Sequence, residues 1–340
     1  MTNTDEAPGL GGFERRLPLW IPICALAGVL LSKFTDAGTY MEALSVRGIS
    51  VPIGICLFFM MYPAVLNLRA SELRKLRDNP KPILLTVFSN WVVAPLVGFA
   101  LAKIFLSDHD ELFVAVILLS ASPCTAMVLV WGSMADGNQE QNVVNTSLNT
   151  VTIMLFYGPL VALLTGLQDI DVDRWGLAIS VVLFIGAPIA LGLLTRVLLI
   201  PRKGEEWFNS VYRPALGKIS IVALLLTLVV LFALNGATII DSPEYLLLVS
   251  VPLLLGFAIV VAFNIAATKL FRLHYREAAI TVIIGSSSHF EIAIATAIAA
   301  YGVGSVAALG TTMGLFWEIP IMLGLVYLQR YLRRRNFWPE

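Results

Sequence analysis

A cysteine next to a proline, inside a long apolar run, is the first feature of this sequence that could do chemistry. Pro123 and Cys124 lie within Ser120–Trp131, which reads SASPCTAMVLVW. Ser122 is a favourable N-cap residue and Pro123 suits the first position of a helix, so we expect a new half-helix to begin here. Cys124 would then lie in the first helical turn, where the helix dipole favours the nucleophilic thiolate. A single soft thiolate suits a thiophilic solute that must be released again.

The two other cysteines, Cys24 and Cys56, also fall inside apolar runs, where a thiol behaves as a small apolar residue. The same interpretation is the alternative for Cys124, although it explains neither the neighbouring proline nor the place of the interruption. The spacing of the three cysteines predicts no disulfide framework and no zinc site. We therefore expect no cofactor and no catalytic metal.

A second group of polar residues interrupts a later apolar run. Ser288, His289, Phe290 and Glu291 have the S-x-x-E spacing of a capping box, which predicts that another half-helix begins there. Both half-helices would direct unpaired N–H groups toward a common point, so Ser122, Ser288 and His289 are candidate substrate-binding residues. Glu291 is a candidate proton-coupling residue, with helix capping as the alternative. For His289 the alternative is a packing role.

Glu318, in the stretch FWEIP, is the only acid well inside the last apolar run. A charged side chain at that depth costs about 3 kcal/mol even on lenient insertion scales. Burial favours the neutral form of a carboxyl, as a proton carrier requires, so Glu318 is the main proton-coupling candidate. The alternative is a structural carboxyl bonded to a neighbouring helix. Asn90, Asn149 and Thr125 are supporting candidates, and hydrogen bonding between helices explains the two asparagines equally well.

The elements that position these residues must be transmembrane helices. The chain is 58% hydrophobic and 14% charged, with a mean hydropathy of +0.82, which is more apolar surface than one soluble core can hide. Backbone groups in lipid must be satisfied within the segment, so we predict an all-α integral membrane protein in the bilayer. The formal net charge of zero predicts no nucleic-acid partner. Ten apolar blocks predict ten spans, at about 17–35, 48–66, 82–106, 112–134, 143–167, 175–200, 216–235, 245–268, 278–300 and 305–328.

Basic residues are concentrated in every second connection between these blocks. By the positive-inside rule these connections are cytoplasmic, which predicts a multi-pass protein of the cell (inner) membrane with both termini in the cytoplasm. The residues concerned are Arg15, Arg16, Arg69, Arg74, Lys75, Arg77, Lys81, Arg196, Arg202, Lys203, Arg213, Lys269, Arg272, Arg276, Arg330, Arg333, Arg334 and Arg335.

The chain contains an internal repeat. Residues 111–129 (ELFVAVILLSASPCTAMVL) and residues 277–295 (EAAITVIIGSSSHFEIAIA) are 166 residues apart, and each passes from apolar residues into a serine cluster. Residues 1–170 and residues 171–340 would each hold five helices, and because five is odd the two copies must have opposite orientations. In such inverted repeats, broken helices meet near the membrane midplane and hold the substrate. We therefore predict that broken helices 4 and 9 meet near the midplane.

These residues resemble the arsenite efflux permeases of the arsenical-resistance type, a branch of the bile acid/sodium symporter superfamily. The resemblance covers nearly the whole chain and is most specific at PCTAMV (123–128), HFEIA (289–293) and WEIP (317–320). It implies that helices 4 and 9 are broken and cross at the midplane. It also implies that a core domain of helices 3–5 and 8–10 moves against a panel domain of helices 1, 2, 6 and 7. It further implies that Cys124 binds trivalent arsenic (arsenite), or antimony (antimonite), as the transported substrate, and that Glu318 couples export to protons.

The sequence departs from that family near the expected site. The family usually has asparagine ahead of the Phe-Glu pair, where this chain has Ser288 and His289. It commonly has Asn-Asp where this chain has Asn149 and Thr150, and often an acid in place of Asn138. These differences remove a carboxylate near the site.

Two other functions are consistent with parts of the sequence. The first alternative is a sodium-coupled transporter of organic anions of the bile acid symporter type. Such relatives have a glutamine four residues after a helix-9 glutamate, where this chain has Ala295 after Glu291, which argues against a sodium site of that kind. The second is a membrane-embedded enzyme with Cys124 as nucleophile and His289 as base. An inverted repeat favours transport over this, because a hydrolase has no need of access from both sides.

Overall fold

Helices make up nearly all of the described chain, as expected for backbone that must satisfy its hydrogen bonds within a membrane. The computed structural model describes residues 17–35, 45–46, 49–66, 79–125, 127–170, 174–241, 243–302 and 304–339. Within these ranges the only strands are the two-residue antiparallel pair β1 (Ser45–Val46) and β2 (Ile49–Ser50). Each of the ten predicted spans is occupied by helix, and six described helices are individually long and apolar enough to cross a membrane. The all-α, multi-pass membrane fold is therefore confirmed.

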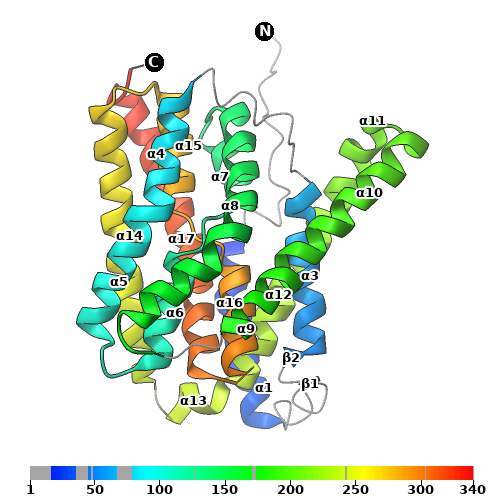
Figure 1. Ribbon diagram of the computed structural model, residues 1–340, viewed down its shortest axis with the longest axis vertical. Helices are drawn as coiled ribbons and strands as arrows, with labels where there is room; N and C mark the ends of the chain where they lie inside the picture. The colour runs from blue at the N-terminus through cyan, green and yellow to red at the C-terminus, as the bar shows by residue number, and fades with distance from the viewer. Residues whose placement is uncertain are drawn as a thin grey trace.

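The helices form two groups that lie side by side in Figure 1. In the smaller group, α12 packs against α1 and α3, and α10 packs against α3. Its members are α1 (Leu17–Phe34), α3 (Val51–Leu66), η4 (Val182–Gly186), α10 (Ala187–Lys203), α11 (Glu205–Trp207), η5 (Phe208–Tyr212), α12 (Arg213–Leu234) and α13 (Gly236–Asp241). Helix α9 (Arg174–Val181) leads into η4 and packs against helices of the larger group. The helices of the smaller group correspond to predicted spans 1, 2, 6 and 7, and their role as a panel domain stays a prediction. Movement of this group against the rest, and the inverted relation of the two halves, stay predictions.

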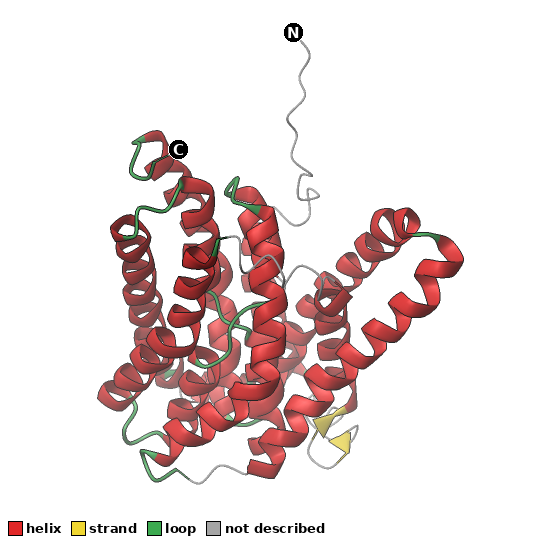
Figure 2. Ribbon diagram, turned by 45° about the horizontal axis from the view of Figure 1, so that its top comes forward, coloured by secondary structure: helices red, strands yellow, loops and turns green. Residues whose placement is uncertain are grey.

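The larger group contains the segments that carry the candidate site residues. Its members are α4 (Pro80–Phe88), η3 (Ser89–Val93), α5 (Ala94–Phe105), α6 (Asp110–Ser120), α7 (Met127–Met134), α8 (Gln139–Gly166), α14 (Glu244–Leu270), α15 (Tyr275–Gly285), α16 (Phe290–Tyr301) and α17 (Val306–Arg334). Helix α17 packs against α6, α14 and α16, which places it in the middle of the group. Figure 2 shows loop segments, in green, in the interior of this group, about halfway along its length.

Three of the long helices contain a wide π-helical turn immediately before a proline. The turns η3, η4 and η5 are each followed by a helix with proline in its second position, namely Pro95, Pro188 and Pro214. Proline has no N–H to donate and its ring displaces the preceding turn, so the local hydrogen-bond pattern must widen. In η3 this widened turn begins with two buried polar residues, Ser89 and Asn90. It therefore changes which side chains helix 3 presents to its neighbours.

Two helices begin with well-formed side-chain caps. The side chain of Asn138 accepts hydrogen bonds from the backbone N–H groups of Glu140 and Gln141 at the start of α8. At the start of α17, the N–H of Ala308 donates to the hydroxyl of Ser305. Such caps satisfy N–H groups that have no partner within the helix, so they set where each helix begins.

One end of the molecule carries basic helix ends. Lys203, Lys269 and Arg333 lie in the last turns of α10, α14 and α17, at the end that also holds the C-terminus (top of Figure 1). This agrees with the sequence alternation, and the assignment of that end to the cytoplasm stays a prediction. Other basic residues used for the prediction lie outside the described residues: Arg15, Arg16, Arg69, Arg74, Lys75 and Arg77.

Candidate functional site

The two predicted helix breaks are present, and they contact each other. Helix α6 ends at Ser120 and α7 begins at Met127, while α15 ends at Gly285 and α16 begins at Phe290. Between them, Pro123 and Ser288 form an antiparallel β-bridge. The backbone N–H of His289 donates to the carbonyl oxygen of Ser122 at 2.6 Å. Two short extended segments, 166 residues apart in sequence, therefore cross and pair inside the bundle.

The start of the second half of helix 4 differs from the sequence prediction. Helix α7 begins at Met127, and the hydroxyl of Ser122 donates backward to the carbonyl of Leu119 at 2.8 Å, so Ser122 is not the N-cap. Cys124 accordingly precedes the half-helix and does not lie in its first turn. The physical reason is the crossing, because the bridge requires Pro123 to be extended and delays the helix. Ala126, next to the helix start, lies outside the described residues.

The predicted capping box in helix 9 is also wrong. His289 occupies the N-cap position of α16 without a side-chain cap, and the Ser288 hydroxyl donates to a carboxylate oxygen of Glu318 at 2.5 Å. The Glu291 carboxylate bonds to the Nδ1 atom of His289 at 2.8 Å. A hydrogen bond to an ionised group is roughly twice as strong as one between neutral groups, so a buried carboxylate competes successfully for the serine.

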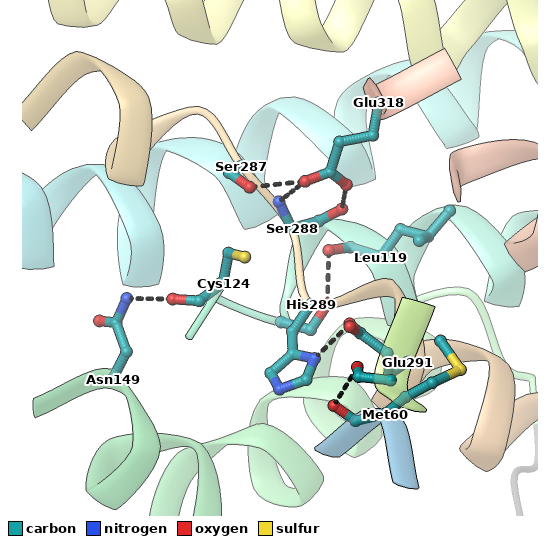
Figure 3. Close-up of polar contacts among 11 residues, drawn as sticks. Met60, Leu119, Cys124, Asn149, Ser287, Ser288, His289, Glu291 and Glu318 are labelled. Atoms are coloured by element: carbon teal, nitrogen blue, oxygen red, sulfur yellow. Dashed lines mark hydrogen bonds and ion pairs between the residues drawn. The ribbon is translucent and has the colours of Figure 1, made fainter. Parts of the chain in front are cut away.

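Glu318 reaches from α17 to the break in helix 9 and is held there by three hydrogen bonds (Figure 3). Its Oε1 atom accepts from the Ser287 hydroxyl at 2.5 Å and from the Ser288 backbone N–H at 3.1 Å. Its Oε2 atom accepts from the Ser288 hydroxyl. Only 2% of the Glu318 surface is exposed, so these donors stand in for the water that would otherwise solvate a carboxylate.

Cys124 is buried at the break in helix 4, and its backbone is held from helix 5. The side-chain N–H of Asn149 donates to the Cys124 carbonyl at 2.9 Å, and Asn90 donates to the Asn149 carbonyl oxygen at 3.3 Å. The candidate Asn90 therefore acts on Cys124 through Asn149. Thr125 is buried beside Cys124.

Sequence reasoning missed three residues that hold the break in helix 9. Ser287 binds Glu318 directly. Ser89 donates to the carbonyl of Gly285, the last residue of α15, at 2.9 Å, and the Asn264 side-chain nitrogen lies 3.0 Å from the same carbonyl. That carbonyl has no partner within the helix, which is why side chains from η3 and α14 satisfy it. Two features of the sequence could have indicated these residues: the run of three serines at the break in helix 9, and single polar residues inside otherwise apolar helices.

The arrangement is a buried polar crossing with two carboxyl groups, one imidazole and one thiol. Within the described ranges, no three histidine, cysteine, aspartate or glutamate residues are grouped to hold a metal ion. Both carboxyl groups at the crossing have local hydrogen-bond partners, because Glu318 has serine donors and Glu291 has the His289 ring. Such a site can bind a small solute and exchange a proton if the smaller and larger groups of helices give access to it from both sides.

Comparison with known proteins gives matches along almost the whole chain. Residues 54–242 match the Sodium Bile acid symporter family. The chain is 35% identical to the uncharacterized transporter slr0944 of Synechocystis sp., over 96% of this chain and 90% of that protein. It is 32% identical to the arsenical-resistance protein Acr3 of Alkaliphilus metalliredigens, over 98% of this chain and 96% of that protein. The arsenical-resistance protein Acr3 of Corynebacterium glutamicum is 31% identical to this chain, over 99% of this chain and 94% of that protein.

Proposed function

Because this chain belongs to the sodium bile acid symporter family, as its motifs predicted, and is a membrane transporter, we propose that it exports trivalent arsenic from the cytoplasm in exchange for protons. The two Acr3 relatives carry the name of arsenical-resistance proteins, and each covers nearly the whole chain. Antimony in the same oxidation state has the same thiophilic chemistry and is the second substrate of the proposal.

The observation that carries the proposal is the link between the thiol and the carboxylate. Glu318 binds Ser288, Ser288 pairs with Pro123, and Pro123 is followed directly by Cys124. A change in the protonation of Glu318 therefore acts on the segment that precedes the thiol. This connection supports Cys124 as the substrate ligand and Glu318 as the proton-coupling group.

In the proposed cycle, neutral arsenite enters from the cytoplasm and meets the Cys124 thiol. The sulfur displaces one hydroxyl group from arsenic, so that an As–S bond forms, an As–O bond breaks and one water leaves with the thiol proton. After the site opens outward, water reverses this exchange and releases arsenite. Protonation of Glu318 from outside then weakens its hold on the serines, and the proton leaves on the cytoplasmic side. Glu291 and His289 form the second proton-exchanging pair of the proposal.

The test is arsenite uptake into everted membrane vesicles, with and without an imposed pH gradient. We expect gradient-dependent uptake by the wild type, loss of at least tenfold for Cys124→Ser, and nearly unchanged uptake for Cys24→Ser as the matched thiol control. Undiminished uptake by Cys124→Ser would exclude the thiol as the ligand. If no metalloid moves and a sodium gradient drives an organic anion instead, the protein is a transporter of the bile acid symporter type.

A further inference from the structure

A cavity of about 70 Å³ lies against the crossing, between η3, α5, α6, α14 and the break in helix 9. One water molecule needs only about 10–15 Å³ of such a cavity, so the cavity has room for a solute of several heavy atoms. Apolar side chains of α5, α6 and α14 form most of its wall, and Cys124 is not among the lining residues. Its polar surface comes from Asn90, Ser120, Ser122, Ser286, Ser287 and Ser288.

Most of the serine hydroxyls at this cavity already donate their one hydrogen bond to another group of the protein. Ser120 donates to a carbonyl of its own helix, Ser122 donates to Leu119, and both Ser287 and Ser288 donate to Glu318. A hydroxyl has one proton and two lone pairs, so these four oxygens are left as acceptors. These four oxygens therefore suit a ligand that donates hydrogen bonds.

The residues that line the cavity also favour a neutral hydrogen-bond donor over a cation. None of the lining residues is charged, and the carboxylate of Glu318 lies behind Ser287 and Ser288 with its oxygens occupied by their donors. A bare cation in this apolar cavity would lose its hydration without gaining a counter-charge, which is unfavourable. A small neutral molecule with several O–H groups meets both conditions.

We propose that this cavity is a second substrate site, which holds arsenite or antimonite as the neutral trihydroxide before or after its exchange at the thiol. The three O–H groups of the trihydroxide donate to the serine oxygens, and no covalent bond forms. The inference rests on the proposed function for the identity of the ligand, while the acceptor character of the cavity follows from the hydrogen bonds alone.

The hydrogen bonds to Glu318 also couple this site to a proton. Ionised Glu318 accepts from both serines, whereas protonated Glu318 has an O–H of its own to donate. That O–H bonds to the oxygen of Ser287 or Ser288, and the serine proton then turns into the cavity. A donor replaces an acceptor there, so the trihydroxide binds less well. Proton and ligand exclude each other, as antiport requires.

Glu291 on α16 interacts electrostatically with Glu318, and it is itself bonded to the ring of His289. The segments of α5, α6 and α14 that line the cavity contribute no titratable side chain to it. The coupling between proton and ligand therefore depends on Glu318 and the two serines that bind it. A substitution at Glu318 tests this coupling directly.

The first experiment measures thermal unfolding of the purified full-length protein with increasing arsenite, in a Cys124→Ser background that removes the thiol ligand. A ligand that binds only the folded state raises the unfolding midpoint. We expect this rise in Cys124→Ser and in Cys124→Ser with Leu96→Phe, whose side chain is exposed on the lipid face of α5. Adding Val97→Phe, which places a ring in the cavity wall, should abolish the rise.

The second experiment repeats this measurement at about pH 6.5 and about pH 8.5. Binding to a site that is closed when Glu318 is protonated weakens as the pH falls. We expect a larger rise at the higher pH in the Cys124→Ser background. Glu318→Gln should give a small, pH-independent rise, because the amide donates to a serine at every pH. Retention of the full effect in Glu318→Gln would overturn the proton coupling.

These results separate the cavity from the transport proposal. If vesicles export arsenite but Val97→Phe retains the arsenite-induced rise, the second site is overturned and the function stands. If vesicles move no arsenite but the rise is present and is lost in Val97→Phe, the site stands and the function falls. A rise that depends on sodium chloride in place of choline chloride, and disappears in Val97→Phe, would replace the neutral ligand with a cation and overturn the proposal.

Discussion

The close approach of α17 to α6 positions Glu318, and Gly310 and Gly314 are the two glycines of α17 that face α6 there. A Cβ atom added at Gly310 would lie 2.7 Å from the Cβ of Ala115 and 3.3 Å from Cδ2 of Leu112. Ala115 is completely buried, and its Cβ cannot move unless α6 moves with it. Small residues at such contacts let membrane helices approach closely. Glu318 lies about two helical turns further along α17, so any shift of this helix displaces its carboxylate from the serines.

We predict that Gly310→Ala destabilises the protein by about 1–3 kcal/mol relative to Gly324→Ala, the cost of overpacking a close contact. Gly324 is the matched control because it lies in the same helix, is exposed, and has no atom within 4 Å of an added Cβ. The gain of about 0.5–1 kcal/mol from replacing glycine inside a helix applies to both variants and cancels in the comparison. Arsenite transport should fall in Gly310→Ala and not in Gly324→Ala.

The assay is thermal unfolding of both variants in detergent, together with vesicle transport. Ala115→Gly removes the other atom of the contact, so the double variant Gly310→Ala, Ala115→Gly should recover stability beyond the sum of the single changes. Equal stability of Gly310→Ala and Gly324→Ala, or strict additivity in the double variant, would refute the argument that this contact sets the position of α17.

Two further predictions concern hydrogen bonds that hold the site and its surroundings. Asn149→Leu leaves the buried Cys124 carbonyl without its donor and should cost about 1–3 kcal/mol and most of the transport. Asn145→Leu, one turn earlier, should cost less, because neither amide atom of Asn145 has a hydrogen-bond partner in the described structure; equal losses in thermal unfolding would contradict this. Tyr275→Phe removes the bond from its hydroxyl to the Ala135 carbonyl and should lower stability by about 1 kcal/mol without changing the half-saturating arsenite concentration, so a changed concentration would assign Tyr275 a role in transport.

The membrane fold and the place of the chemistry were predictable from sequence because they depend on local patterns. Ten apolar blocks of sufficient length predict ten spans whatever their packing, and each block is helical in the structure. Pro123 in one block and the serine run before His289 in another mark two breaks, because each interrupts an apolar helix locally. The repeat then indicates that the breaks correspond.

The roles of individual side chains at the breaks were not predictable, because they depend on competition between partners distant in sequence. Ser288 has the spacing of a helix cap, yet its hydroxyl donates to Glu318. A hydrogen bond to a buried carboxylate is stronger than the bond that a capping serine makes with a backbone N–H group. Asn264 and Ser89 look like ordinary interhelical polar residues until the end of α15 is brought against them.

Sequence by itself determined that Cys124 stands at an interruption of a membrane helix and that a matching interruption follows 166 residues later. Only the tertiary structure decided that Cys124 precedes its half-helix, that Glu318 and not a helix end holds Ser288, and that the serine hydroxyls beside it are left as acceptors. The reason is that each hydroxyl has a single proton. Which acceptor receives the hydrogen bond depends on the distances between helices, and these distances cannot be read from the spacing of residues in the sequence.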